Sequence, residues 1–134
     1  MRANVANLSS YEEDVLEAGT YEVEVTKVEE VTANSGTEGM RLSFRILDGP
    51  DTRLGAPSQG RALSDTLWYP NASMKDGGNF AGVRLKKACE IAGVTIDEKG
   101  FDCEDFLSTS FGVKVKLEEY EGTVNAKVAN YVAV

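Results

Sequence analysis

The sequence contains no histidine among its 134 residues. This absence excludes Ser–His and Cys–His nucleophile pairs and any acid–base step that depends on an imidazole. Cysteine is scarce as well, and Cys89 and Cys103 cannot assemble a typical zinc site without a histidine partner. We therefore expect no metal, no cofactor and no enzymatic activity. In a reducing cytoplasm, Cys89 is expected to be a buried free thiol rather than half of a disulfide.

Long apolar runs are also missing from the chain. None approaches the roughly 20 residues that span a bilayer, and the start, Met1 to Asn4, lacks the apolar stretch of a signal peptide. We therefore expect a cytoplasmic protein without a membrane partner. A chain of this length fits one domain that buries its own core.

Five segments alternate apolar and polar residues, which is the pattern of strands that bury one face. They lie near residues 21–26, 40–46, 63–67, 111–117 and 124–128, and a segment of helical period lies at 80–92. Three strands, a helix and two strands in this order are typical of the OB fold. The predicted fold class is therefore mainly β, a five-stranded Greek-key OB-like barrel with one helix between strands 3 and 4.

The boundaries follow from turn formers and charge. Residues 1–18 are polar and acidic and are expected to form an N-terminal arm, followed by the barrel domain at 19–134. Asn79 is expected to cap the start of the helix and Gly93 to end it. One further helical turn is expected at 102–107.

The net charge of −8 is unfavourable for a protein that binds nucleic acid, unless its cations gather on one surface. If the apolar residues of 40–46 point inward, Arg41 and Arg45 point outward. The same alternation and the strand starts place four more cations outside: Arg61, Lys114, Lys116 and Lys127. A second interpretation is that Arg41 and Arg45 pair with Glu22 and Glu24 across the first hairpin. Both interpretations remain open.

The only tryptophan, Trp68, is expected on the strand face opposite Leu63 and Leu67. Beside Tyr69 it could stack on nucleic-acid bases, and Tyr120 in the last hairpin is another candidate. The alternative is that Trp68 caps the core or packs under a loop.

The segment 35–50, Ser-Gly-Thr-Glu-Gly-Met-Arg-Leu-Ser-Phe-Arg-Ile-Leu-Asp-Gly-Pro, resembles a family of phage-encoded proteins. Many of its members are uncharacterised, and some are OB-fold proteins that bind single-stranded DNA. Shorter pieces at 18–21, 60–61, 85–94 and 111–115 also match. The resemblance implies the OB fold and residence in the host cytoplasm. Two features depart from it: the connection at 51–60 is longer, and the chain end lacks an acidic tail that recruits partners.

Two functions are consistent with these observations. The first is non-catalytic binding of single-stranded DNA in phage DNA replication or recombination, with little sequence preference, as a possible homodimer that also contacts replication or recombination proteins. The residues expected to contact DNA are Arg41, Arg45, Arg61, Lys114, Lys116 and Lys127 at phosphates, and Trp68, Tyr69 and Tyr120 at bases. The alternative is a protein-interaction or assembly module, such as a phage accessory or virion component, which the acidic balance favours. An acidic mimic of DNA is a third, intermediate case.

Overall fold

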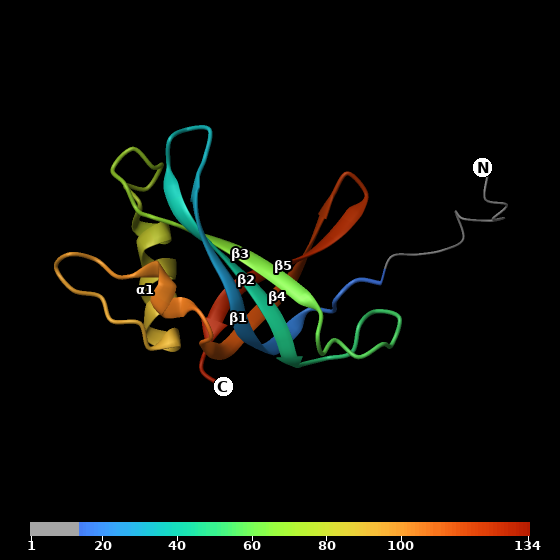
Figure 1. Cartoon of the computed structure of the whole chain (residues 1–134). Coiled ribbons are helices and arrows are strands. Elements are labelled where there is room, and N and C mark those ends of the chain that lie inside the picture. The colour runs from blue at the N-terminus through green and yellow to red at the C-terminus, as the bar shows by residue number, and fades with distance from the viewer. Residues whose placement is uncertain (1–13) are drawn as a thin grey trace, which may run out of the picture.

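A computed structural model describes residues 14–134, so most of the predicted N-terminal arm, residues 1–13, lies outside the described residues (Figure 1). Five strands, one α-helix and one 3₁₀ helix follow in chain order: β1 (Gly19–Thr32), β2 (Glu38–Asp48), β3 (Ala62–Trp68), α1 (Asn79–Ala92), η2 (Cys103–Phe106), β4 (Ser110–Tyr120) and β5 (Thr123–Val132). This order confirms the predicted three strands, helix and two strands. No helix in the described part has the length and hydropathy to span a membrane.

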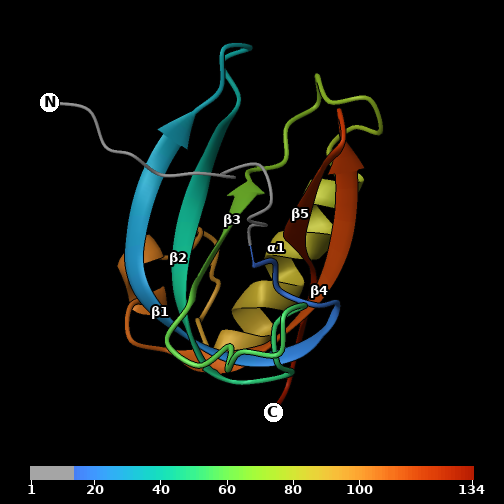
Figure 2. The same ribbon diagram turned by 90° about the vertical axis from the view of Figure 1, so that its right-hand side faces the viewer.

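The five strands form one antiparallel sheet in the order β3-β2-β1-β4-β5. The return of β4 to the side of β1 is the Greek-key arrangement. No ladder joins the edge strands β3 and β5 within residues 14–134, so the hydrogen-bonded sheet is open at this seam. The sheet curls strongly, and its β1–β2 and β4–β5 hairpins project as two arms, residues 27–43 and 116–127 (Figures 1 and 2).

The core lies on the concave side of the curl, where the alternation predicted from sequence places its apolar residues. Phe44 of β2, Phe111 of β4 and Tyr131 of β5 meet there, with ring centroids 5.5–6.4 Å apart. The helix α1 covers one end with its buried Leu85, Ala88 and Cys89. Cys89 is a free, buried thiol as predicted, and burial raises its pKa to about 11.

The start of α1 differs from the prediction. Asn79 is the first helical residue, and the cap position belongs to Gly78, whose φ of 87° is left-handed and suits glycine. The carboxylate of Asp76 provides the missing acceptor, at 2.7 Å from the amide of Phe80 and 3.0 Å from that of Gly78. The end at Gly93, with φ 77°, is confirmed.

Side chains join the two edge strands where backbone hydrogen bonds do not. The hydroxyl of Tyr131 on β5 donates to the carboxylate of Asp65 on β3 at 2.7 Å. Arg84 of α1 donates to the same oxygen at 2.8 Å and to the carbonyl of Val128 at 3.3 Å. Burial and the neighbouring Asp65 charge raise the pKa of Tyr131 well above its usual range. These three side chains therefore hold β3, β5 and α1 together.

Candidate nucleic-acid-binding groove

A groove runs along the outer side of the seam between β3 and β5. One part, of about 450 Å³, extends from Trp68 past Arg41 to Lys127. A second part, of about 490 Å³, continues past Arg41 to Arg61 and Asp14. Four residues line both parts: Arg41, Ser64, Asn125 and Ala126. The two parts are therefore one continuous surface, which we call the seam groove.

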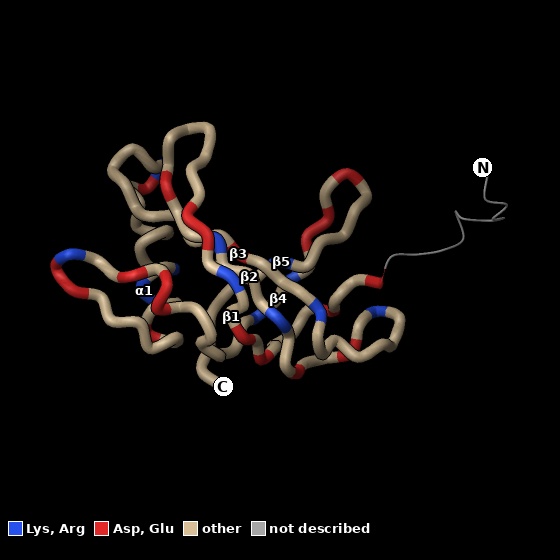
Figure 3. Tube along the Cα trace, viewed as in Figure 1, with Lys and Arg blue, Asp and Glu red and all other residues tan. Residues whose placement is uncertain are grey.

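Strand register explains why these side chains share one face. In the β2–β3 ladder, Arg41 stands opposite Thr66 and Ser43 opposite Ser64, while Gly39 stands opposite Trp68. Cross-strand partners point to the same side of a sheet, and their neighbours in sequence point into the core. The floor of the seam groove thus carries hydroxyl groups around one guanidinium. Figure 3 shows cations of β2 between the two arms and acidic residues on both arms.

Arg41 is exposed at the centre of the seam groove, and within residues 14–134 it forms no ion pair. Its cross-strand partner on β1 is Glu29, whose carboxylate lies 3.0 Å from Lys27. Arg45 differs, because it pairs with Glu24 at 3.2 Å. The cross-strand interpretation is therefore confirmed for Arg45 and wrong for Arg41.

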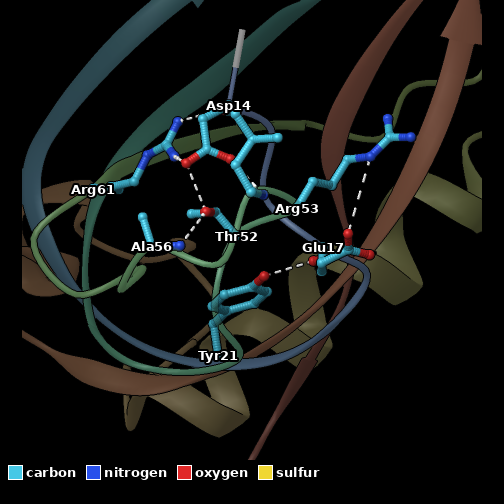
Figure 4. A network of polar contacts seen from close by, with 8 residues as sticks. Asp14, Glu17, Tyr21, Thr52, Arg53, Ala56 and Arg61 are labelled. Carbon is cyan, nitrogen blue, oxygen red and sulfur yellow. Dashed lines mark hydrogen bonds and ion pairs between the residues drawn. The ribbon is translucent and has the colours of Figure 1, made fainter. Parts of the chain in front are cut away.

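Arg61 stands at the other end of the seam groove in a dense polar network (Figure 4). It donates to the carbonyl oxygen of Asp14 at 2.7 Å, and its guanidinium lies 3.6 Å from the Asp14 carboxylate. That carboxylate also accepts from the Thr52 hydroxyl at 2.6 Å and from the Leu54 amide at 3.1 Å. The hydrogen bond from Thr52 is the main cause that lowers the pKa of Asp14. The segment before β1 is thereby fastened to the 51–60 connection.

The lysines of the last hairpin share one carboxylate. Lys116 and Lys127 face each other across the β4–β5 ladder, and Glu118 lies 3.1 Å from the first and 3.0 Å from the second. Hydrogen bonds from Lys127 and Lys116 lower the pKa of Glu118. Of the predicted lysines, only Lys127 lines the seam groove, while Lys114 is exposed on β4 and pairs in register with Asn130.

The three aromatic residues predicted to contact bases do not lie together in the structure. Trp68 lines the seam groove on the face opposite Leu67, as expected, and lies over Gly39, where a Cβ atom would come 2.7 Å from the indole. Tyr69 points the other way and hydrogen-bonds the Cys103 thiol at 3.0 Å, so the structure does not bring it beside Trp68. Tyr120 is 72% exposed near the tip of the β4–β5 arm.

The seam groove thus unites four of the nine predicted residues: Arg41, Arg61, Trp68 and Lys127. It also contains residues that the prediction missed, above all Ser64, Thr66 and Asn125. The alternation of Ser64 and Thr66 with Leu63 and Leu67 was the available signal for the two hydroxyls. No sequence signal pointed to the contact of Arg84 with Asp65.

The fold and groove define a small, mainly β protein with a single open Greek-key sheet and a polar cleft along its seam. The chain matches the model of a protein family of unknown function, DUF669, over residues 3–133. It therefore belongs to that family. No curated protein matches the sequence.

Proposed function

We propose that this protein binds single-stranded DNA in the seam groove, without catalysis, and acts in phage DNA replication or recombination. We also propose that the sheet is an OB-like barrel, with the Asp65, Tyr131 and Arg84 contacts taking the place of a β3–β5 ladder. The Greek-key strand order supports this fold, and OB folds bind oligonucleotides on the face of strands 2 and 3.

The observation that carries the proposal is an uncompensated guanidinium in the middle of a polar groove. Arg41 can hold a phosphate with two parallel hydrogen bonds, and the hydroxyls of Ser64 and Thr66 lie in the same groove for further polar contacts. Trp68 at one end offers a face on which a base can stack, a contact worth roughly 1–3 kcal/mol. None of these contacts reads a base edge, so little sequence preference is expected.

The acidic arms support a preference for single-stranded DNA over duplex DNA. Acidic residues on both arms stand beside the groove floor that carries Arg41 (Figure 3). A single strand can place its phosphates on the floor, whereas the second strand of a duplex would bring its phosphates towards these carboxylates. Like charges repel, so duplex DNA should bind more weakly.

The test is a titration of fluorescently labelled oligo-dT and of a duplex of equal length, at low and moderate salt. Anisotropy reports binding, and Trp68, as the only tryptophan, reports contact with the groove. We expect salt-sensitive binding to oligo-dT with quenching of Trp68, and weaker binding to the duplex.

Arg41→Glu is the decisive variant, and Lys87→Glu on the exposed side of α1 is its control with the same change of net charge. Arg41→Glu should weaken oligo-dT binding at least about tenfold, whereas Lys87→Glu should change it little. Equal losses in the two variants would mean that only net charge matters. No binding by the unmodified protein at low salt would refute the proposal.

A further inference from the structure

A second concave surface lies beside α1, on the other side of the β1–β2 arm. Glu30, which lines it, stands opposite Met40 in the ladder, whereas Arg41 of the seam groove stands opposite Glu29. Adjacent residues of a strand point to opposite faces, so the two surfaces are separate. This cavity has a volume of about 650 Å³, and we call it the helix-side cavity.

The walls of the helix-side cavity are largely apolar and held in place by the core. Leu85 of α1, Tyr69 and Phe101 line it, together with Ile96, which remains 47% exposed. The rings of Tyr69 and Phe101 meet edge to face with centroids 6.1 Å apart. The hydroxyl of Tyr69 is hydrogen-bonded to Cys103, so the cavity is formed before any ligand arrives. A preformed apolar cavity of this size can receive a large side chain.

An acidic hollow adjoins the cavity and shares five of its lining residues. This hollow, of about 840 Å³, adds Asp97, Asp102, Glu104 and Asp105 to Glu30. The carboxylates of Asp97 and Asp102 accept hydrogen bonds from backbone amides of their own loop. Within the described residues, Glu30, Glu104 and Asp105 form no ion pair, and Lys99 is the only cation in the hollow. The carboxylates outnumber Lys99, so the hollow carries a net negative charge beside the cavity, which Lys86 also lines.

We propose that the helix-side cavity and its acidic hollow bind a peptide segment of a partner protein in which a large apolar side chain adjoins Lys or Arg. The apolar side chain enters between Phe101 and Ile96, and the basic residues lie against Glu30, Glu104 and Asp105. Charge complementarity selects this occupant, because the same carboxylates repel phosphates. The net charge of −8 attracts a basic partner at longer range. This inference does not depend on DNA binding in the seam groove.

The test selects peptides from a random display library on the whole protein and measures the enriched sequences as labelled synthetic peptides. We expect an aromatic or Leu residue beside Lys or Arg, and affinity that falls with salt. Ile96→Glu, and separately Glu104→Lys with Asp105→Lys, should each weaken binding about tenfold or more. Leu54→Glu, which changes another apolar residue that is 59% exposed, is the matched control and should bind normally.

Several results would overturn the inference. They are failure to enrich any peptide, enrichment of peptides without basic residues, and equal affinity for all variants. Sedimentation of the protein alone can provide a further result that overturns the inference. Self-association that is lost in Ile96→Glu would assign the surface to a second copy of the chain instead. Thermal melting of each variant distinguishes a lost contact from a lost fold, because Ile96, Glu104 and Asp105 are all exposed.

Discussion

Replacement of Tyr131 by Phe removes one oxygen atom from the contact that joins β3 to β5. The ring is 1% exposed and packs against Phe44 and Phe111, and the variant keeps these contacts. The loss is the hydrogen bond from the hydroxyl to the Asp65 carboxylate at 2.7 Å. Asp65 keeps Arg84 at 2.8 Å, so its charge is still compensated. The substitution therefore measures one bond across the seam.

The expected cost follows from the charge of the acceptor. A hydrogen bond to a charged group contributes about 1.5–3 kcal/mol to the free energy of unfolding. The unfolding entropy of a chain of 134 residues is about 0.28 kcal/mol per kelvin, so the melting temperature should fall by about 5–11 °C.

The same substitution has a pH signature with a definite sign. The pKa of Tyr131 is raised in the folded protein, because burial and Asp65 disfavour its anion. The stability that its neutral form contributes is therefore complete below the unfolded pKa of 10.0 and declines above it, where the unfolded chain loses its proton first. One such group lowers the free energy of unfolding by about 1.4 kcal/mol per pH unit. The difference between the unmodified protein and Tyr131→Phe should thus shrink as pH rises from about 10 to 11.5.

Thermal unfolding measures the melting temperature, and urea unfolding at a series of pH values measures the free energy of unfolding, both followed by Trp68 fluorescence and circular dichroism. Tyr120→Phe is the matched control, because its side chain is 72% exposed, and the change should stay within about 0.5 kcal/mol. Tyr21 and Tyr69 also have raised pKa values, so some alkaline loss of stability remains in the variant. A melting temperature equal to that of Tyr120→Phe, or a difference that is constant with pH, would refute this account of the seam.

Three further predictions concern smaller features. If the seam groove binds DNA, Glu118→Gln should tighten oligo-dT binding, because it frees Lys116 and Lys127 from their shared carboxylate. The slope of log affinity against log salt should steepen by up to about 1.4. An unchanged slope would mean that these lysines do not contact the DNA. Asp76→Ala should lower the melting temperature, because two helix-start amides lose their acceptor, whereas Asn79→Ala should not; equal effects in a melting assay would contradict the observed cap. A thiol reagent at about pH 8 should modify Cys103 first and Cys89 only on unfolding, because burial keeps the Cys89 thiol protonated; mass spectrometry of the labelled peptides would show the opposite order if this is wrong.

The element order could be predicted from sequence because the strands alternate wherever one face is buried. β1 was expected near 21–26 but extends to Thr32, past a bulge between Val25 and Lys27. Beyond the bulge no residue of β1 is fully buried and only Val28 packs against the core, so the alternation of apolar and polar residues is lost. The OB-like barrel is predicted from the element order, and this order does not determine whether the edge strands β3 and β5 form a ladder.

The candidate site was predictable to the extent that it depends on alternation within one strand. Arg41 and Trp68 were placed on the correct face by this rule, and the same rule would have directed Tyr69 to the side of Leu67. Alternation within one strand does not predict the ion pairs, because these join residues of different segments. The contact of Arg61 with Asp14 joins residues 47 positions apart through an irregular connection. The sharing of Glu118 by two lysines depends on the β4–β5 register, which sequence does not provide.

These pairings change what the acidic composition implies for the proposed function. Arg45 is neutralised by Glu24, Arg61 by Asp14, and the lysines of the last hairpin by Glu118. A phosphate can bind Arg41 directly, but at each of these paired cations it must displace a carboxylate of the same chain. Because each displaced carboxylate regains its own counterions, the net release of counterions is small. On this argument the slope of log affinity against log salt lies nearer about −0.7, the value for one phosphate contact, than about −3.5, the value for contacts at all of these cations. A protein of this kind would bind single strands weakly at each site and dissociate readily.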